Sequence, residues 1–132
     1  MQVPGLTTIK SHRGARETMN RLEEAVKARG MTVFARIDHA AGASAVGMPL
    51  NPTEVLIFGN ARGGTPLMQS VPTIGIDLPL KALVWQDASG ETWLSFNDPA
   101  WLAQRHGLSG AETAVGNLTA ALNALAKEAI SE

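Results

Sequence analysis

The fold is decided by residues 13–38, which read RGARETMNRLEEAVKARGMTVFARID. The first part carries an apolar stripe at steps of three and four, which predicts one buried face of a helix: Ala15, Met19, Leu22 and Val26. Gly30 ends this helix, because glycine readily adopts the left-handed conformation that follows a helix end. From Met31 the period changes to two, which predicts a strand running to Asp38.

Alternation along residues 31–38 predicts a strand with two unlike faces. One face is apolar and carries Met31, Val33, Ala35 and Ile37. The other face carries Thr32, Phe34, Arg36 and Asp38. We therefore expect the apolar face to pack against the helices and Arg36 and Asp38 to lie on the opposite, free face of the sheet.

Further strands and a second long helix follow along the chain. Apolar runs predict strands at residues 6–10, 55–58, 80–86 and 92–96. The cluster DASGE at 87–91 predicts a hairpin between the last two of these strands. Residues 39–49 are expected to form a loop, either without regular structure or with one helical turn. Short helices are expected around 66–70 and from Asp98-Pro99 onward.

The C-terminal segment predicts the second main helix. Ser109 and Glu112 have the spacing of a capping box, and apolar residues then repeat at helical spacing to the end of the chain. Two amphipathic helices must bury their apolar stripes against a common surface. We therefore expect a single domain over residues 1–132 of the α+β class, in the order β-α-β-β-β-β-α. It is a two-layer sandwich in which both helices cover one face of a mostly antiparallel sheet.

Composition narrows the classes of function. The 132 residues include no cysteine, which excludes disulfides and thiolate chemistry within this sequence. The formal net charge of −1 does not favour nucleic-acid binding, and no apolar run is long enough to cross a membrane. The first residues show no pattern of a signal peptide, so we expect a cytoplasmic protein with neither nucleic acid nor membrane as partner.

Four stretches together carry a resemblance to a known family: ETMNRLEEAVKARGMTVFARIDHAAGA (17–43), NPTEVLIFGNARGGTPLMQ (51–69), GIDLPLKALVWQD (75–87) and WLSFNDPAWLAQRHGL (93–108). The chain resembles the bacterial and archaeal domain of unknown function 302 family over about residues 7–125. The resemblance implies a TATA-binding-protein-like α+β fold with a curved antiparallel sheet, commonly as a homodimer, and implies no established reaction. Phe96 stands where the family often has tyrosine, and residues 61–64 replace a Pro-Lys-Ala-Gly-like turn.

Arg36, Asp38 and His39 form the most chemically suggestive group. Two residues apart in a strand, Arg36 and Asp38 share a face, so the guanidinium would hold the carboxyl ionised. His39 carries an imidazole, the side chain that proteins use most often for proton transfer near neutral pH. The alternative is structural: Asp38 caps the turn that follows the strand and His39 packs beneath it.

Asn60, Arg62 and Lys81 complete the candidate ligand-binding set. The glycine-rich residues 59–66 lack the lysine of a phosphate loop, so they form either a plain turn or a weak anion nest with Arg62 supplying charge. Lys81 shares a strand face with Leu83 and Trp85, and it either faces a ligand or extends along the sheet edge toward water. The three histidines lie far apart in the sequence, so no metal or cofactor is expected.

These observations favour a binding or accessory module, but they do not identify its ligand. We expect a homodimer with a shallow polar pocket on the sheet face near residues 36–39 and 59–65, suited to a small anionic ligand. A second hypothesis is an enzyme that uses Asp38 or His39 as general base, with Arg62 or Lys81 stabilising an anion. A third is an interaction protein in which Trp85, Trp93 or residues 40–47 contact a partner subunit.

Overall fold

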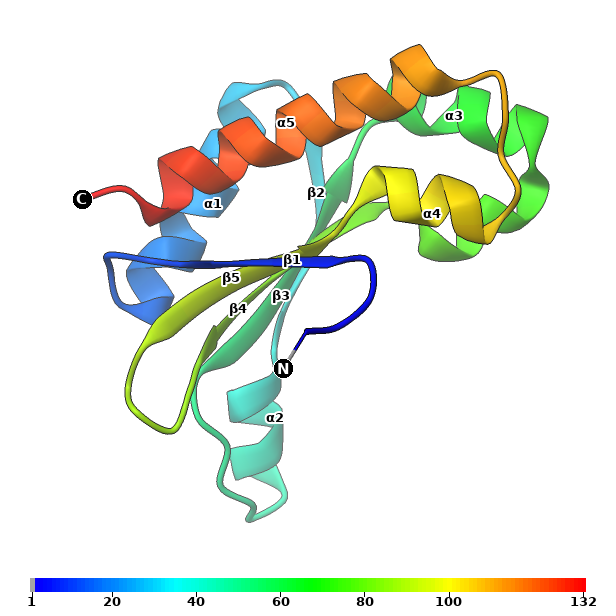
Figure 1. The fold of residues 1–132 in the computed structure, drawn as a ribbon. Helices are drawn as coiled ribbons and strands as arrows, with labels where there is room; N and C mark the ends of the chain where they lie inside the picture. The colour runs from blue at the N-terminus through cyan, green and yellow to red at the C-terminus, as the bar shows by residue number, and fades with distance from the viewer. Residues whose placement is uncertain (1) are drawn as a thin grey trace.

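A five-stranded antiparallel sheet organises the computed structural model, which describes residues 2–132 (Figure 1). In chain order its strands are β1 (Leu6–Lys10), β2 (Thr32–Asp38), β3 (Thr53–Gly59), β4 (Leu80–Gln86) and β5 (Thr92–Asn97). Their order across the sheet is β1-β5-β4-β3-β2, and every neighbouring pair is antiparallel. The expected α+β class, the antiparallel sheet and the β4–β5 hairpin are confirmed.

Two long helices cover one face of this sheet. They are α1 (Ala15–Ala28) and α5 (Glu112–Ile130), which pack against each other and against the strands. The predicted stripe of α1 is buried at Met19, Leu22 and Val26, and Gly30 has the predicted positive φ of 75°. Because both apolar stripes face the sheet, the two-layer arrangement follows from the periodicity of the two helices.

Shorter helices lie between β2 and β4 and between β5 and α5, and the predicted element order omits them. They are α2 (His39–Ala45), α3 (Ala61–Ser70), the 3-10 helix η1 (Pro72–Asp77) and α4 (Pro99–Arg105). The expected loop at 39–49 therefore begins with a seven-residue helix, longer than the single turn allowed for, and the short helix expected around 66–70 begins earlier, at Ala61. The short helix expected from Asp98-Pro99 is confirmed as α4. Figure 1 shows α2 projecting from one end of the sheet and α3 and α4 near the N-terminal half of α5.

The predicted capping box of α5 is wrong. The N-cap is Ala111, and no side chain hydrogen-bonds the first turn of the helix. Gly110 has a φ of 77°, in the left-handed region. This turn separates Ser109 from the helix start, so its hydroxyl does not cap the helix.

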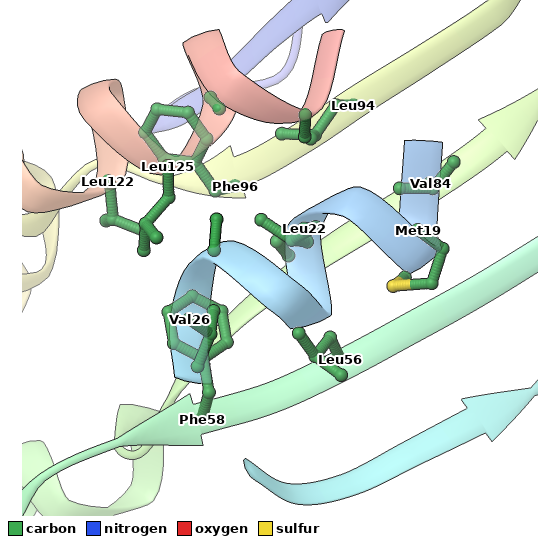
Figure 2. Packing of buried hydrophobic residues seen from close by; sticks show 14 of the residues in the cluster. Met19, Leu22, Val26, Leu56, Phe58, Val84, Leu94, Phe96, Leu122 and Leu125 are labelled. Atoms are coloured by element: carbon green, nitrogen blue, oxygen red, sulfur yellow. The ribbon is translucent and has the colours of Figure 1, made fainter. Parts of the chain in front are cut away.

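The core lies between the helices and one face of the sheet. Alternate strand residues supply the sheet side: Leu56, Phe58, Ala82, Val84, Leu94 and Phe96. Leu22 and Val26 of α1 and Leu125 of α5 meet them from the helix layer (Figure 2). These side chains are nearly completely removed from water, so the central part of the helix-covered face is filled by the core.

A β-bulge changes which way β2 points its side chains. Val33 pairs with Phe58, but Ala35 pairs with Ile57, so Phe34 is an extra residue without its own partner. One inserted residue moves every later side chain to the opposite face. The expectation that Arg36 and Asp38 occupy the free face is therefore wrong: Arg36 pairs with Leu56 on the helix-covered face, and Ile37 faces outward instead.

Candidate ligand site on the open sheet face

The face of the sheet away from α1 and α5, called here the open sheet face, carries mostly apolar side chains. On β2 to β5 these side chains alternate with the core residues and include Ala35, Ile37, Val55, Ile57, Lys81, Leu83, Trp85, Trp93, Ser95 and Asn97, and β1 adds Leu6, Thr8 and Lys10. Trp85 and Trp93 stack with ring centroids 6.2 Å apart. Most of these side chains are half-buried by one another, so a partner or ligand on this face meets a prepared apolar surface.

Arg36 serves the fold on the helix-covered face. Its guanidinium donates to both carboxylate oxygens of Glu54, at 2.8 and 3.1 Å, and to Glu23 of α1 at 3.2 Å. The hydrogen bonds from Arg36 to Glu54 raise the pKa of the guanidinium above its usual value, against the opposing effect of burial. Arg36 therefore ties β2 and β3 to α1, and its charge is already neutralised by protein groups.

Asp38 caps α2, as the structural alternative proposed. Its Oδ1 accepts a hydrogen bond from the amide of Ala41 at 2.9 Å. The bulge turns Asp38 toward the helix-covered side, whereas His39 reaches the open sheet face. The two neighbouring residues consequently belong to different surfaces and do not form one acid–base site.

His39 and Lys81 are the two predicted residues that the structure brings together. Both line a hollow of about 450 Å³ on the open sheet face. Its floor is apolar, with Val55, Ile57 and Leu83, and its remaining polar lining comes from Ser95 and Asn97 of β5. This hollow is our candidate functional site. The sequence reasoning missed Asn97, although the period-two pattern from Trp93 through Ser95 to Asn97 was a signal for it.

Lys81 carries an unpaired charge in this hollow. Its side chain is half-buried, and no carboxylate among residues 2–132 lies within 4.0 Å of its ammonium group. Ser95 is already occupied, since its hydroxyl accepts from Trp85 Nε1 at 2.9 Å and hydrogen-bonds Thr8 at 2.8 Å. The available polar groups of the hollow are thus Lys81, His39 and Asn97.

Asn60 and Arg62 lie elsewhere, at the start of α3. The Asn60 side chain accepts from the Gly63 amide at 2.7 Å and so caps this helix. Asn60 also borders a second, apolar hollow of about 350 Å³ whose larger side chains include Phe34, Met68 and Leu118. Arg62 is exposed to solvent on the first turn. Residues 36–39 and 59–65 therefore do not share one pocket.

Residues 2–132 show neither a metal-binding cluster nor a membrane-spanning helix. No group of three or more histidine, aspartate or glutamate side chains has a metal-binding arrangement there. Within the same range, every helix is too short or too polar to cross a bilayer.

The fold and the hollow define a small α+β protein with helices on one sheet face and a partly apolar recess on the other. The chain belongs to the family described as Domain of unknown function DUF302, whose model matches residues 7–125. A crystal structure of a DUF302 protein from Bacillus stearothermophilus superposes with a TM-score of 0.85, covering 96% of this chain and 99% of that one. The two sequences are 21% identical, so this likeness establishes the shared fold alone.

Two curated relatives from Brucella are closer in sequence. Proteins of Brucella suis biovar 1 and Brucella abortus biovar 1, each called Fluoride-specific ion channel FluC 1, are 55% identical to this chain over 104 residues. The match covers 79% of this chain but only 41% and 38% of those proteins. The chain therefore spans about two fifths of the relatives' length.

Proposed function

We propose that this protein is a binding module that takes a small organic anion on the open sheet face. The observation that carries the proposal is Lys81, a half-buried cation that has no carboxylate partner among residues 2–132. A cation held partly out of water is stabilised by an anion that replaces its lost hydration. The best ligand therefore carries a carboxylate or a similar anionic group for Lys81.

The rest of the hollow specifies the remainder of the ligand. Val55, Ile57 and Leu83 form its floor, and contact with them contributes about 25 cal/mol for each Å² of apolar surface removed from water. Asn97 and His39 line the hollow and offer hydrogen-bonding groups to a ligand. A volume of about 450 Å³ lies within the range of small-molecule sites. We infer an organic anion with one apolar side, such as an aromatic carboxylate.

The Brucella relatives suggest where such a module works. Their name describes an ion channel, and about three fifths of each relative lies outside the match to this chain. We propose that channel activity belongs to that remaining part and that the region shared with this chain is an accessory domain on the cytoplasmic side. In this view the present protein contributes ligand binding, and the transport of fluoride is not its own activity.

Titration with benzoate tests the anion site, with benzamide as the neutral counterpart of nearly the same shape. We expect benzoate to bind measurably tighter than benzamide in calorimetric titration. The Lys81→Met variant should weaken benzoate binding by roughly 10-fold or more, because a hydrogen bond to a charged group is worth about 1.5–3 kcal/mol.

Lys10→Met is the matched control for this titration. Lys10 is an exposed lysine on β1 that pairs with Glu91 at 2.7 Å, so its loss should leave benzoate binding unchanged. Equal affinity for benzoate and benzamide, or an unaltered affinity in Lys81→Met, would overturn the proposed anion site.

We further propose that two copies of the chain associate through the segment from α2 to β3. Residues 40–50 contain no charged side chain, and Val46, Met48 and Leu50 are 71%, 63% and 49% exposed. A projecting, uncharged segment with three exposed apolar side chains is typical of a contact surface. A second copy supplies an equivalent apolar surface in a two-fold symmetric pair.

Light scattering after size exclusion tests this association. We expect the unaltered protein to have the mass of a dimer and the Met48→Glu variant to shift toward the monomer, since a buried carboxylate opposes the contact. Val3→Glu alters an exposed valine outside the segment and should leave the mass unchanged. A monomeric mass for the unaltered protein would contradict the proposed pair.

A further inference from the structure

A hydrogen-bonded chain of threonine, histidine and aspartate lies away from the open sheet face, where η1 meets the end of α4. The Thr73 hydroxyl is 2.9 Å from Nδ1 of His106, and Nε2 of the same ring is 2.5 Å from Oδ2 of Asp77. Thr73 and Asp77 belong to η1, whereas His106 is the C-cap of α4. None of these three residues lines the hollow of Lys81.

The charges around Asp77 determine where the protons lie. Partial burial raises the pKa of Asp77, but the hydrogen bond from His106 and the charge of Arg105 outweigh it and hold the pKa below its usual value. Arg105 donates to both carboxylate oxygens of Asp77, at 2.9 and 2.8 Å. An ionised carboxylate only accepts hydrogen bonds, so Nε2 of His106 carries the proton toward it.

His106 is consequently arranged as a base toward Thr73. The ring of His106 lies between the two side chains, with Nε2 toward the carboxylate of Asp77 and Nδ1 toward the hydroxyl of Thr73. With the proton on Nε2, the lone pair of Nδ1 accepts the hydrogen bond from the Thr73 hydroxyl. A hydroxyl bonded to a base that a carboxylate in turn orients is the arrangement that activates a nucleophile.

We propose that Thr73 is an activated nucleophile that accepts an acyl group from a small activated donor. Exposure supports this role, because Thr73 is open to solvent while the side chains of His106 and Asp77 are only 9% and 14% exposed. The hydroxyl is thus accessible to a donor in solution, whereas its base and the carboxylate behind it are shielded from competing water. The site is independent of the anion site at Lys81.

The reaction with an acyl phosphate balances without any further reactant. Oγ of Thr73 attacks the acyl carbon, and the bond from that carbon to the phosphate oxygen breaks. The phosphate leaves with the bonding electron pair. The hydroxyl proton passes to Nδ1 of His106 and from there to the departing phosphate, which restores the neutral imidazole. The products are an ester on Thr73 and inorganic phosphate.

Incubation of the whole chain with acetyl phosphate tests the proposal, with acetylation of each threonine measured by peptide mass spectrometry. Thr32 and Thr113 are internal controls, because both are exposed and neither side chain hydrogen-bonds a histidine among the described residues. General-base assistance is worth about 100-fold or more. We expect Thr73 to be acetylated faster than either control by roughly that factor, and Thr73→Val to lose only the adduct in its own peptide.

Two further variants show whether fast acetylation of Thr73 comes from its hydrogen bond to His106 or only from its exposure to solvent. Thr73→Ser retains the hydroxyl and should retain acetylation at this position. His106→Gln removes the base and should reduce acetylation of Thr73 to the rate of Thr113, with an unfolding transition recorded to verify that the variant is folded. Acetylation of Thr73 no faster than that of Thr113, or an unchanged rate in a folded His106→Gln variant, would overturn the proposal.

Discussion

Replacing Phe58 by alanine is expected to lower the free energy of unfolding by about 3–5 kcal/mol. Phe58 is completely buried on β3 and points into the core beside Val26 of α1 (Figure 2). The substitution removes a large apolar surface and leaves a cavity between the sheet and the helix, which the neighbouring backbone fills only in part. Because a domain of this size has a total stability of about 5–15 kcal/mol, this one change should leave it close to unfolding.

Phe34→Ala is the matched control, and urea unfolding of both variants is the measurement. Phe34 is the bulged residue of β2 and is 57% exposed, so its loss should cost less than about 1 kcal/mol. The two phenylalanines lie on neighbouring strands and differ mainly in burial. A similar loss of stability in both variants would mean that Phe58 does not lie at the centre of the core.

The parts of the fold that the sequence predicted are those governed by local periodicity. The stripe of α1 and its end at Gly30 depend on residues within one helix, and the β4–β5 hairpin depends on the short turn between its strands. Neither requires knowledge of distant contacts. The class of fold follows from these elements, because two amphipathic helices and an antiparallel hairpin have few ways to share one core.

The bulge at Phe34 could not be predicted from the same patterns. Residues 31–38 alternate regularly and contain no glycine or proline to mark an interruption. The extra residue is set by the pairing of β2 with β3, which lies some twenty residues further along the chain. Its effect is large, since it moved Arg36 and Asp38 from the predicted pocket to the helix-covered face.

The candidate site was predictable only in part, for a related reason. Lys81 was identified as a face-sharing neighbour of Leu83, which is local information. His39 joins it only because β2 ends where β3 and β4 pass, and that arrangement depends on the register of two strand pairs. Likewise, Asp77 and His106 are nearly thirty residues apart, and only the packing of η1 against α4 brings them together.

Replacing Arg36 by methionine is expected to lower the free energy of unfolding by about 1–3 kcal/mol. The methionine retains most of the apolar side chain but leaves Glu54, which is 13% exposed, without its two hydrogen-bond donors. A carboxylate that is largely removed from water and has lost its partner is destabilising. Arg62→Met is the control, because Arg62 is exposed and has no ion pair within residues 2–132, so chemical unfolding should show little change.

A second substitution distinguishes the lost partner from lost packing. In the Arg36→Met variant, Glu54→Gln removes the carboxylate charge that has lost its partner, so it should restore part of the free energy of unfolding. The same change in the unaltered protein should lower the free energy of unfolding.

The dependence of stability on acid pH provides a further check. Hydrogen bonds from Lys27 and then Arg36 lower the pKa of Glu23, so its contribution to stability is present above the unfolded pKa and is lost as the pH falls. Arg36→Met should therefore lose less stability than the unaltered protein on acidification. Additive effects of the two substitutions, together with an unchanged acid response, would mean that Arg36 stabilises the fold through its apolar contacts rather than its charge.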